Sequence, residues 1–354
     1  MRGQPLPEEK RGLQKQRMSG HQSRAYPLPS GLASNIRSYR PPLWLRNGHL
    51  QSVWPTLFRR IALAEPVTQR IDTPDGDELH LDWYRQGSPR LAILSHGLEG
   101  HSRRPYMQGL ARGLLADGWD VLAWNFRSCG GRMNRLPRFY HSGATQDLHA
   151  VVSHALADSA GYGHLALSGF SMGGNLTLLY LAEQGERIDS RIRGAVTYSV
   201  PCDLAGSARV LALPSRRIYM QRFLKDLQVK MADKARDFPD LIDMTGFDDI
   251  RSFQQFDDRY TAPLHGFRDA DDYWAQASCL PRLPEIRVPS LIVNAADDPF
   301  LSAACYPEKR GQLGPWVTLE APRWGGHVGF VEIARDGYYW SERRALNFLR
   351  GLLG

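Results

Sequence analysis

The sequence has few cysteines and no long apolar run. Cys129, Cys202, Cys279 and Cys305 are far apart and form no Cys-x-x-Cys pair, so the ligand spacing of a zinc site is missing. Reduced thiols are therefore expected. Largely apolar stretches such as residues 176–182 are much shorter than the roughly 18 residues that a membrane-spanning helix needs. This argues against an integral membrane protein.

A secretory signal is also missing, because no apolar segment precedes a small-residue cleavage site near the N-terminus. We therefore expect a cytoplasmic protein. Hydrophobic residues make up 42% and charged residues 23% of the 354 residues, which is ordinary for a globular protein. This length allows two domains or one large α/β domain.

Positive charge is concentrated at the N-terminus. The chain carries a formal net charge of +7, and residues 1–40 hold eight Lys or Arg against only Glu8 and Glu9, which leaves +1 for the remainder. The basic character thus belongs to a tail, residues 1–38, whose composition predicts that it is mostly disordered. We expect no nucleic-acid partner for the body of the protein. Transient contact with a membrane surface is left open.

Strand-like and helical segments alternate from residue 77 onward. Short apolar or alternating runs are bounded by glycine or proline and separated by helical periods of roughly 10–15 residues, which is typical of βαβ units and a parallel sheet. This alternation stops near residue 201 and resumes near residue 290. The predicted strands are 78–84, 91–95, 119–126, 164–170, 194–200, 290–294 and 316–320, and the predicted helices are 105–117, 142–158, 173–184 and 341–353.

These segments predict an α/β fold with a mostly parallel, doubly wound sheet flanked by helices. The predicted core comprises residues 39–201 and 286–354. Residues 202–285 contain helical patterns without a clear strand and are predicted to form a helical lid insertion. Such an insertion is expected to lie over the carboxyl ends of the strands, where ligands bind in doubly wound folds.

A Gly-x-Ser-x-Gly motif at residues 169–173 follows a predicted strand and opens a predicted helix. This context is that of a nucleophile elbow centred on Ser171. A sharp turn strains the backbone of the nucleophile, so its neighbours must lack side chains. The N-terminus of the new helix favours a developing oxyanion. The alternative reading is an ordinary glycine turn.

A serine nucleophile needs a base and an orienting carboxylate, and the chain supplies both in the order Ser, Asp, His. Asp297 and Asp298 follow a predicted strand, and His327 lies between glycines after the next one. One aspartate is expected to accept a hydrogen bond from His327, and the other to cap the following turn. These residues alone leave the choice open. His327 could otherwise be a surface turn histidine.

The second oxyanion donor is expected in residues 96–100, after the strand at 91–95. We predict that the backbone N–H of Leu98 pairs with that of Met172. The spacing of His96, Glu99 and His101 matches no metal motif, so no metal is expected. The chain also lacks a glycine loop of the kind that cradles phosphates or dinucleotides, so no cofactor is expected.

Several longer motifs carry a family resemblance, from about residue 40 to the C-terminus. They are residues 47–51, 96–100, 169–175, 256–258, 262–267, 297–299 and 325–330. With them the chain resembles the YheT-like branch of the α/β-hydrolases, which includes bacterial hydrolases and eukaryotic esterases and phospholipases.

This resemblance implies the α/β-hydrolase fold and a catalytic triad of Ser171, Asp298 and His327. Asp298 is chosen because the acid in this pattern immediately precedes a Pro-apolar pair. The resemblance further implies short-chain ester, monoacylglycerol or phospholipid substrates. The chain departs from its relatives at residues 127–129, which read Arg-Ser-Cys where the relatives tend to have Arg-Gly-Cys.

The expected function is a serine carboxylic-ester hydrolase that acts on a small-molecule ester through an acyl-enzyme. The alternatives are an acyltransferase that uses the same residues and a non-catalytic binding scaffold. The oligomeric state is left open. Asn47 and His49 are expected to tie the N-terminal segment to the body. Cys129 has no assigned base and is expected to be a packing residue, and the apolar residues of the insertion are expected to pack the lid.

Overall fold

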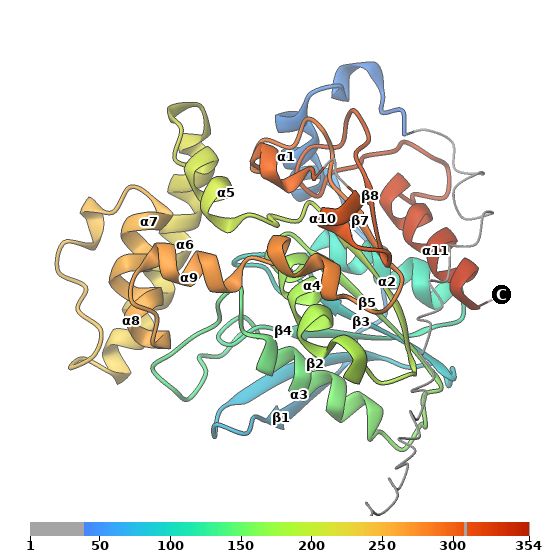
Figure 1. Ribbon diagram of the computed structural model, residues 1–354, viewed down its shortest axis with the longest axis horizontal. Coiled ribbons are helices and arrows are strands. Elements are labelled where there is room, and N and C mark those ends of the chain that lie inside the picture. The colour runs from blue at the N-terminus through green and yellow to red at the C-terminus, as the bar shows by residue number, and fades with distance from the viewer. Residues whose placement is uncertain (1–38, 308–309, 354) are drawn as a thin grey trace, which may run out of the picture.

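The computed structural model describes residues 39–307 and 310–353, so the predicted tail lies outside the described residues. Eight strands form one sheet in the order β1-β2-β4-β3-β5-β6-β7-β8 (Figure 1). β2 pairs antiparallel with β1 and with β4, and every later pairing is parallel, which confirms the mostly parallel sheet. The strands are β1 (Val67–Asp72), β2 (Glu78–Tyr84), β3 (Arg90–Ser95), β4 (Asp120–Asn125), β5 (His164–Phe170), β6 (Ile192–Tyr198), β7 (Ser290–Val293) and β8 (Val317–Glu320).

The sequence pattern predicts every strand except β1. The central strands β3, β4 and β5 are buried along nearly their whole length, since helices cover both faces of a parallel sheet, and they therefore read as apolar runs. β1 lies at the sheet edge and is mostly exposed, so its sequence VTQRID carries no apolar signal.

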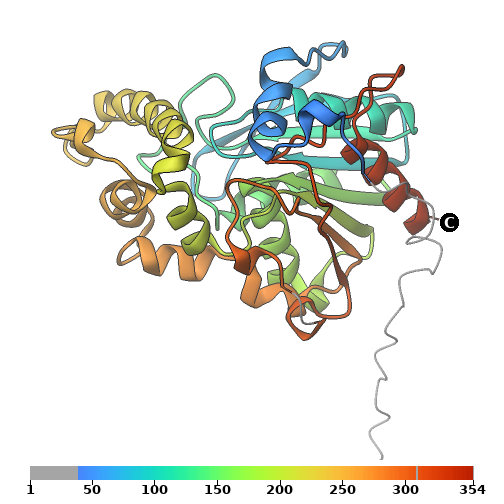
Figure 2. The ribbon, with the colours of Figure 1, turned by 90° about the horizontal axis from the view of Figure 1, so that it is seen from above.

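Helices cover both faces of the sheet (Figure 2). α2 and α11 contact each other on one face, and α3 and α4 contact each other on the opposite face. Each pair encloses a separate buried apolar cluster. The helices are α1 (Gly48–Phe58), α2 (Pro105–Ala116), α3 (Thr145–Leu156), α4 (Met172–Gln184), α5 (Leu204–Leu211), α6 (Arg217–Asp237), α7 (Phe253–Phe256), α8 (Ala262–His265), α9 (Ala270–Ala277), α10 (Arg310–Leu313) and α11 (Trp340–Leu353).

Helices α5 to α9 lie between β6 and β7 in the chain and gather at one end of the molecule, coloured yellow to orange in Figure 1. This is the segment for which the sequence predicts a lid. A short π-helical turn, Asp257–Thr261, joins α7 to α8. Within the described part of the chain, no helix combines the length and apolarity needed to cross a membrane.

Candidate active site

Ser171 lies in the one-residue turn between β5 and α4. Its backbone has φ +53° and ψ −121°, a conformation that residues with side chains rarely adopt. A Cβ atom on Gly169 would lie 2.2 Å from the carbonyl oxygen of Gly173, and one on Gly173 would lie 2.3 Å from that of His96. Both positions therefore require glycine, as expected for a nucleophile elbow.

A chain of hydrogen bonds joins the three residues of the predicted triad. His327 Nε2 lies 2.9 Å from Ser171 Oγ, and His327 Nδ1 lies 2.9 Å from Asp298 Oδ2. The Asp298 side chain is fully buried, while that of His327 is 12% exposed. A buried carboxylate next to Nδ1 favours the tautomer that leaves Nε2 free to accept the serine proton.

The two adjacent aspartates differ in their hydrogen-bond partners. Asp298 contacts the His327 ring and also accepts the backbone N–H of Phe300 at 2.9 Å, so it caps its own turn. Asp297 instead accepts the N–H of Gly326 at 2.8 Å, and burial raises its pKa. The prediction that the second aspartate caps the turn is therefore wrong. Asp297 holds the histidine loop.

Residues that are distant in the sequence support the His327 loop. The N–H of His327 donates to Ser52 Oγ at 2.7 Å, and the N–H of Val328 donates to Ser199 Oγ at 2.8 Å. The Phe300 ring stacks on the imidazole with ring centroids 4.1 Å apart. Ser52 directly follows the motif at 47–51, which is the one hint that the sequence offers.

Asn47 and His49, expected to tie the N-terminal segment to the body, have different roles. Asn47 caps α1, because its side chain accepts the N–H groups of His49 and Leu50. The His49 ring stacks on Tyr219 of α6, and its Nδ1 lies 3.0 Å from the tyrosine hydroxyl. The contact of His49 is therefore with the helical insertion.

The backbone N–H groups on either side of Leu98, a predicted oxyanion donor, both donate to tyrosine hydroxyls. The N–H of Gly97 donates to the Tyr106 hydroxyl and that of Glu99 to the Tyr140 hydroxyl, both at 3.1 Å. Over residues 39–307 and 310–353, the N–H groups of Leu98 and Met172 have no protein acceptor. Two spare donors thus flank Ser171, and their role as an oxyanion hole remains a prediction.

His96 anchors the loop that carries Leu98. Its ring is fully buried, and burial lowers its pKa to about 3, so it is neutral. Its Nδ1 lies 2.7 Å from the Gly97 carbonyl, and its Nε2 accepts the N–H of Phe126 at 3.1 Å. Both ring nitrogens are thus engaged in backbone contacts. Among the described residues, no group of three or more His, Cys, Asp or Glu side chains is placed to hold a metal.

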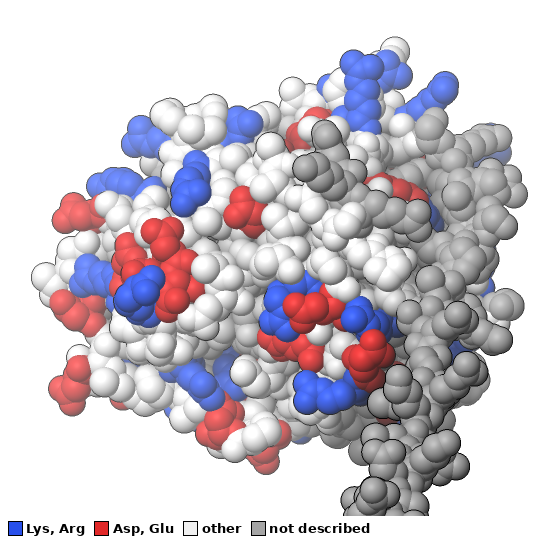
Figure 3. Space-filling view, viewed as in Figure 1, with Lys and Arg blue, Asp and Glu red and all other residues white. Residues whose placement is uncertain are grey.

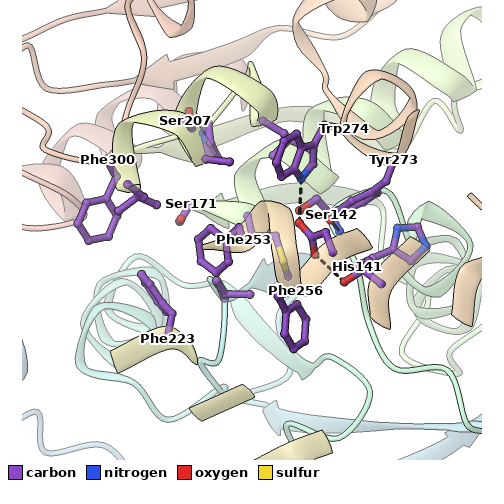
Figure 4. Close-up of a pocket in the computed structure, with 18 of the residues that line it drawn as sticks. His141, Ser142, Ser171, Ser207, Phe223, Phe253, Phe256, Tyr273, Trp274 and Phe300 are labelled. Atoms are coloured by element: carbon purple, nitrogen blue, oxygen red, sulfur yellow. Dashed lines mark hydrogen bonds between the residues drawn. The ribbon is translucent and has the colours of Figure 1, made fainter. Parts of the chain in front are cut away.

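Two pockets meet at Ser171 and His327. The first extends under the helical insertion, where Phe223, Phe253 and Phe256 lie around Ser171 (Figure 4). The second lies between α1 and α6. Its lining is more polar: it includes Glu99, Arg104, Arg222 and Asp226.

Comparisons with known proteins identify the family. The family of the alpha/beta hydrolase fold matches residues 93–332. YheT of Escherichia coli (strain K12), a protein named for an expected esterase activity, is 36% identical over 305 residues, which cover 84% of this chain and 88% of YheT. The chain belongs to the YheT-like α/β-hydrolases. Mouse phospholipase ABHD3 is 32% identical over 83% of this chain and 74% of its own length.

Solved structures show the same fold. The esterase Pf2001 of Pyrococcus furiosus matches with a TM-score of 0.56 over 89% of this hydrolase and 98% of that chain, at 18% sequence identity. Curated relatives named esterase and phospholipase place this α/β-hydrolase among enzymes that hydrolyse carboxylic esters.

A buried ion pair connects the helical insertion of this hydrolase to the loop at residues 96–100. Lys230 of α6 lies 2.7 Å from the Glu99 carboxylate, and the two side chains are only 6% and 10% exposed. Lys230 also donates to Cys129 Sγ at 3.1 Å, and Tyr140 donates to the Glu99 carboxylate. Burial raises the pKa of the Cys129 thiol to about 11, so it stays protonated and unreactive.

Lys230→Met is expected to destabilise the fold by about 3–5 kcal/mol, because it leaves the Glu99 carboxylate buried without its countercharge. The double variant Glu99→Gln/Lys230→Met should recover most of this loss. Lys234→Met is the matched control, since Lys234 is equally buried on the same helix but donates only to the Leu136 carbonyl. Urea unfolding measures the free energy of unfolding of the two single variants and the double variant. Equal losses for Lys230→Met and the double variant would contradict the ion-pair account.

Asp257 is a buried carboxyl in the wall of the first pocket. It accepts the Trp274 indole N–H at 2.9 Å and the Thr261 hydroxyl at 2.6 Å. Burial raises its pKa from 3.8 to about 7. The folded protein therefore binds more protons than the unfolded chain between these two values, and its stability falls as the pH rises through that window.

Asp257→Asn should remove this pH dependence, because asparagine keeps an acceptor but no ionisable group. Between pH 5 and pH 8 the wild type should lose about 3 kcal/mol more unfolding free energy than the variant does, at 1.36 kcal/mol for each pH unit up to the folded pKa. Urea unfolding at the two pH values gives the difference. Parallel losses in both proteins would show that Asp257 is not the titrating group.

Proposed function

We propose that this chain hydrolyses carboxylic esters with Ser171 as the nucleophile, His327 as the general base and Asp298 as the residue that orients His327. The observation that carries the proposal is the continuous hydrogen-bond chain Asp298–His327–Ser171 at the junction of the two pockets. Spare N–H donors of Leu98 and Met172 lie beside the nucleophile.

The reaction follows from this geometry. His327 Nε2 takes the proton from Ser171 Oγ as the oxygen attacks the ester carbonyl, and the resulting oxyanion accepts the N–H groups of Leu98 and Met172. His327 then protonates the leaving alcohol, which departs and leaves an acyl-serine. Water, activated by the same imidazole, attacks the acyl-enzyme and releases the acid.

The side chains that line the two pockets suggest which pocket holds the acyl chain and which holds the alcohol part of the ester. The first pocket is lined mainly by apolar and aromatic side chains and suits an acyl chain. The second pocket holds charged side chains and suits the alcohol part. An apolar acyl pocket beside a pocket that also holds charged side chains suits acylglycerols or phospholipids, and the name of ABHD3 as a phospholipase agrees with this substrate class.

A series of p-nitrophenyl esters from acetate to palmitate tests the acyl pocket. Each buried methylene contributes about 0.8 kcal/mol, so kcat/KM should rise roughly fourfold per methylene until the pocket is full and then fall. Phe253→Ala enlarges the pocket and should move the optimum to longer chains while changing acetate hydrolysis much less. Leu241→Ala, at an exposed site on the same insertion, is the control. Identical profiles for all three proteins would place the acyl chain elsewhere.

A further inference from the structure

Helix α1 and the turn before it expose an unusual number of large apolar side chains. Leu50, Leu57 and Phe58 are 52%, 54% and 59% exposed, although a surface helix normally shows polar residues to solvent. Contiguous exposed apolar surface of this kind marks an interaction site. The apolar face of α1, as it is called below, consists of Leu43, Trp44, Leu50, Val53, Leu57 and Phe58.

This face borders the mouth of the second pocket. Val53 belongs both to the face and to the pocket lining, and the His49–Tyr219 stack joins α1 to α6 across the mouth. On the α6 side, Ile218 is 82% exposed. The route from this surface to Ser171 therefore passes between two elements that both present apolar side chains.

Positive charge that forms no ion pair lies beside the apolar face. Arg46 and Arg60 lie at the two ends of α1, and Arg222 of α6 lines the second pocket. All three side chains are exposed, and within the described residues none of them forms an ion pair. Residues 43–60 contain no acidic residue. Lys and Arg side chains project along the upper edge of the molecule in Figure 3.

We propose that the apolar face of α1 docks on an anionic lipid surface, so that the second pocket opens toward the membrane. Apolar side chains would enter the headgroup region while the surrounding cations contact lipid phosphates, which is the pattern of interfacial helices. The docking does not depend on the proposed function. Only the passage of a lipid ester from the membrane to Ser171 does.

Charge complementarity favours an anionic bilayer on this face over a second copy of the chain and over the chain's own N-terminal residues. A second copy would bring the same cations together across an isologous interface, which like-charge repulsion disfavours. The chain's own residues 1–38 carry a net positive charge and would be repelled by the same rim. An anionic bilayer satisfies both the apolar face and the cations.

Vesicle sedimentation of the full chain tests the proposal, with vesicles of phosphatidylcholine alone and of phosphatidylcholine containing about one third phosphatidylglycerol. We expect binding mainly to the anionic vesicles, weakened by high salt. Leu50→Ser/Leu57→Ser/Phe58→Ser should lower the partition coefficient about tenfold or more. Val67→Ser/Val229→Ser/Leu241→Ser changes three apolar residues outside α1 that are at least as exposed, and it should leave binding unchanged.

Hydrolysis of p-nitrophenyl acetate serves as a folding and activity control for both triple variants, and we expect it to match the wild type. An inactive wild type that still sediments would defeat the proposed function and leave the docking intact. Equal binding of the two triple variants would overturn the docking. Loss of vesicle binding on deletion of residues 1–38 alone would also overturn the docking. The same holds if the wild type is a dimer that the α1 substitutions convert to a monomer.

Discussion

Ser171→Ala is expected to lower ester turnover by about 10³-fold or more. The substitution removes the attacking oxygen, and only the oxyanion donors and substrate binding remain to accelerate hydrolysis by water. The elbow itself should survive, because alanine adds no atoms beyond the serine Cβ and keeps the backbone conformation that the neighbouring glycines permit. Single-turnover assays with a p-nitrophenyl ester measure the loss.

Ser168→Ala is the matched control for this experiment. Ser168 lies three residues earlier on β5, is buried, and donates only to the Val196 carbonyl at 2.8 Å. Its turnover should stay near that of the wild type. A fluorophosphonate probe should label the wild type and Ser168→Ala but not Ser171→Ala. Unchanged turnover in a folded Ser171→Ala protein would refute the enzymatic mechanism proposed above.

Asp298→Asn should lower turnover by about 10⁴-fold, because an amide next to His327 Nδ1 favours the wrong imidazole tautomer and cannot stabilise the imidazolium that forms during attack. Measuring kcat together with the free energy of unfolding in urea separates this loss of turnover from a simple loss of stability.

Asp297→Asn is the comparison that distinguishes the two neighbouring carboxylates. The amide introduced by this substitution would still offer a side-chain oxygen to the Gly326 N–H, and Asp297 Oδ2 has no hydrogen-bond partner in the described structure. Turnover should therefore fall by only a few-fold, with stability changed by about 1 kcal/mol. A larger loss of turnover at Asp297 than at Asp298 would reverse the assignment.

Local sequence determined the parts of this protein whose geometry depends on adjacent residues. The glycines at 169 and 173 are required by a backbone turn that Ser171 occupies with positive φ, so the elbow could be predicted from five residues. Buried strands under two layers of helices must be apolar, which is why the parallel strands could be predicted and the exposed edge strand β1 could not.

Only the tertiary structure decided which distant groups meet. Asp297 and Asp298 have the same chemistry and adjacent positions, and their different partners depend on the path of the loop that carries His327. The supports from Ser52 and Ser199 come from segments 275 and 129 residues away in the sequence from the groups they bind. The second pocket exists because α1 and α6 approach each other, which no local pattern encodes. Sequence specified the reactive groups, and the packing of remote segments determined their partners and the surface through which a substrate reaches them.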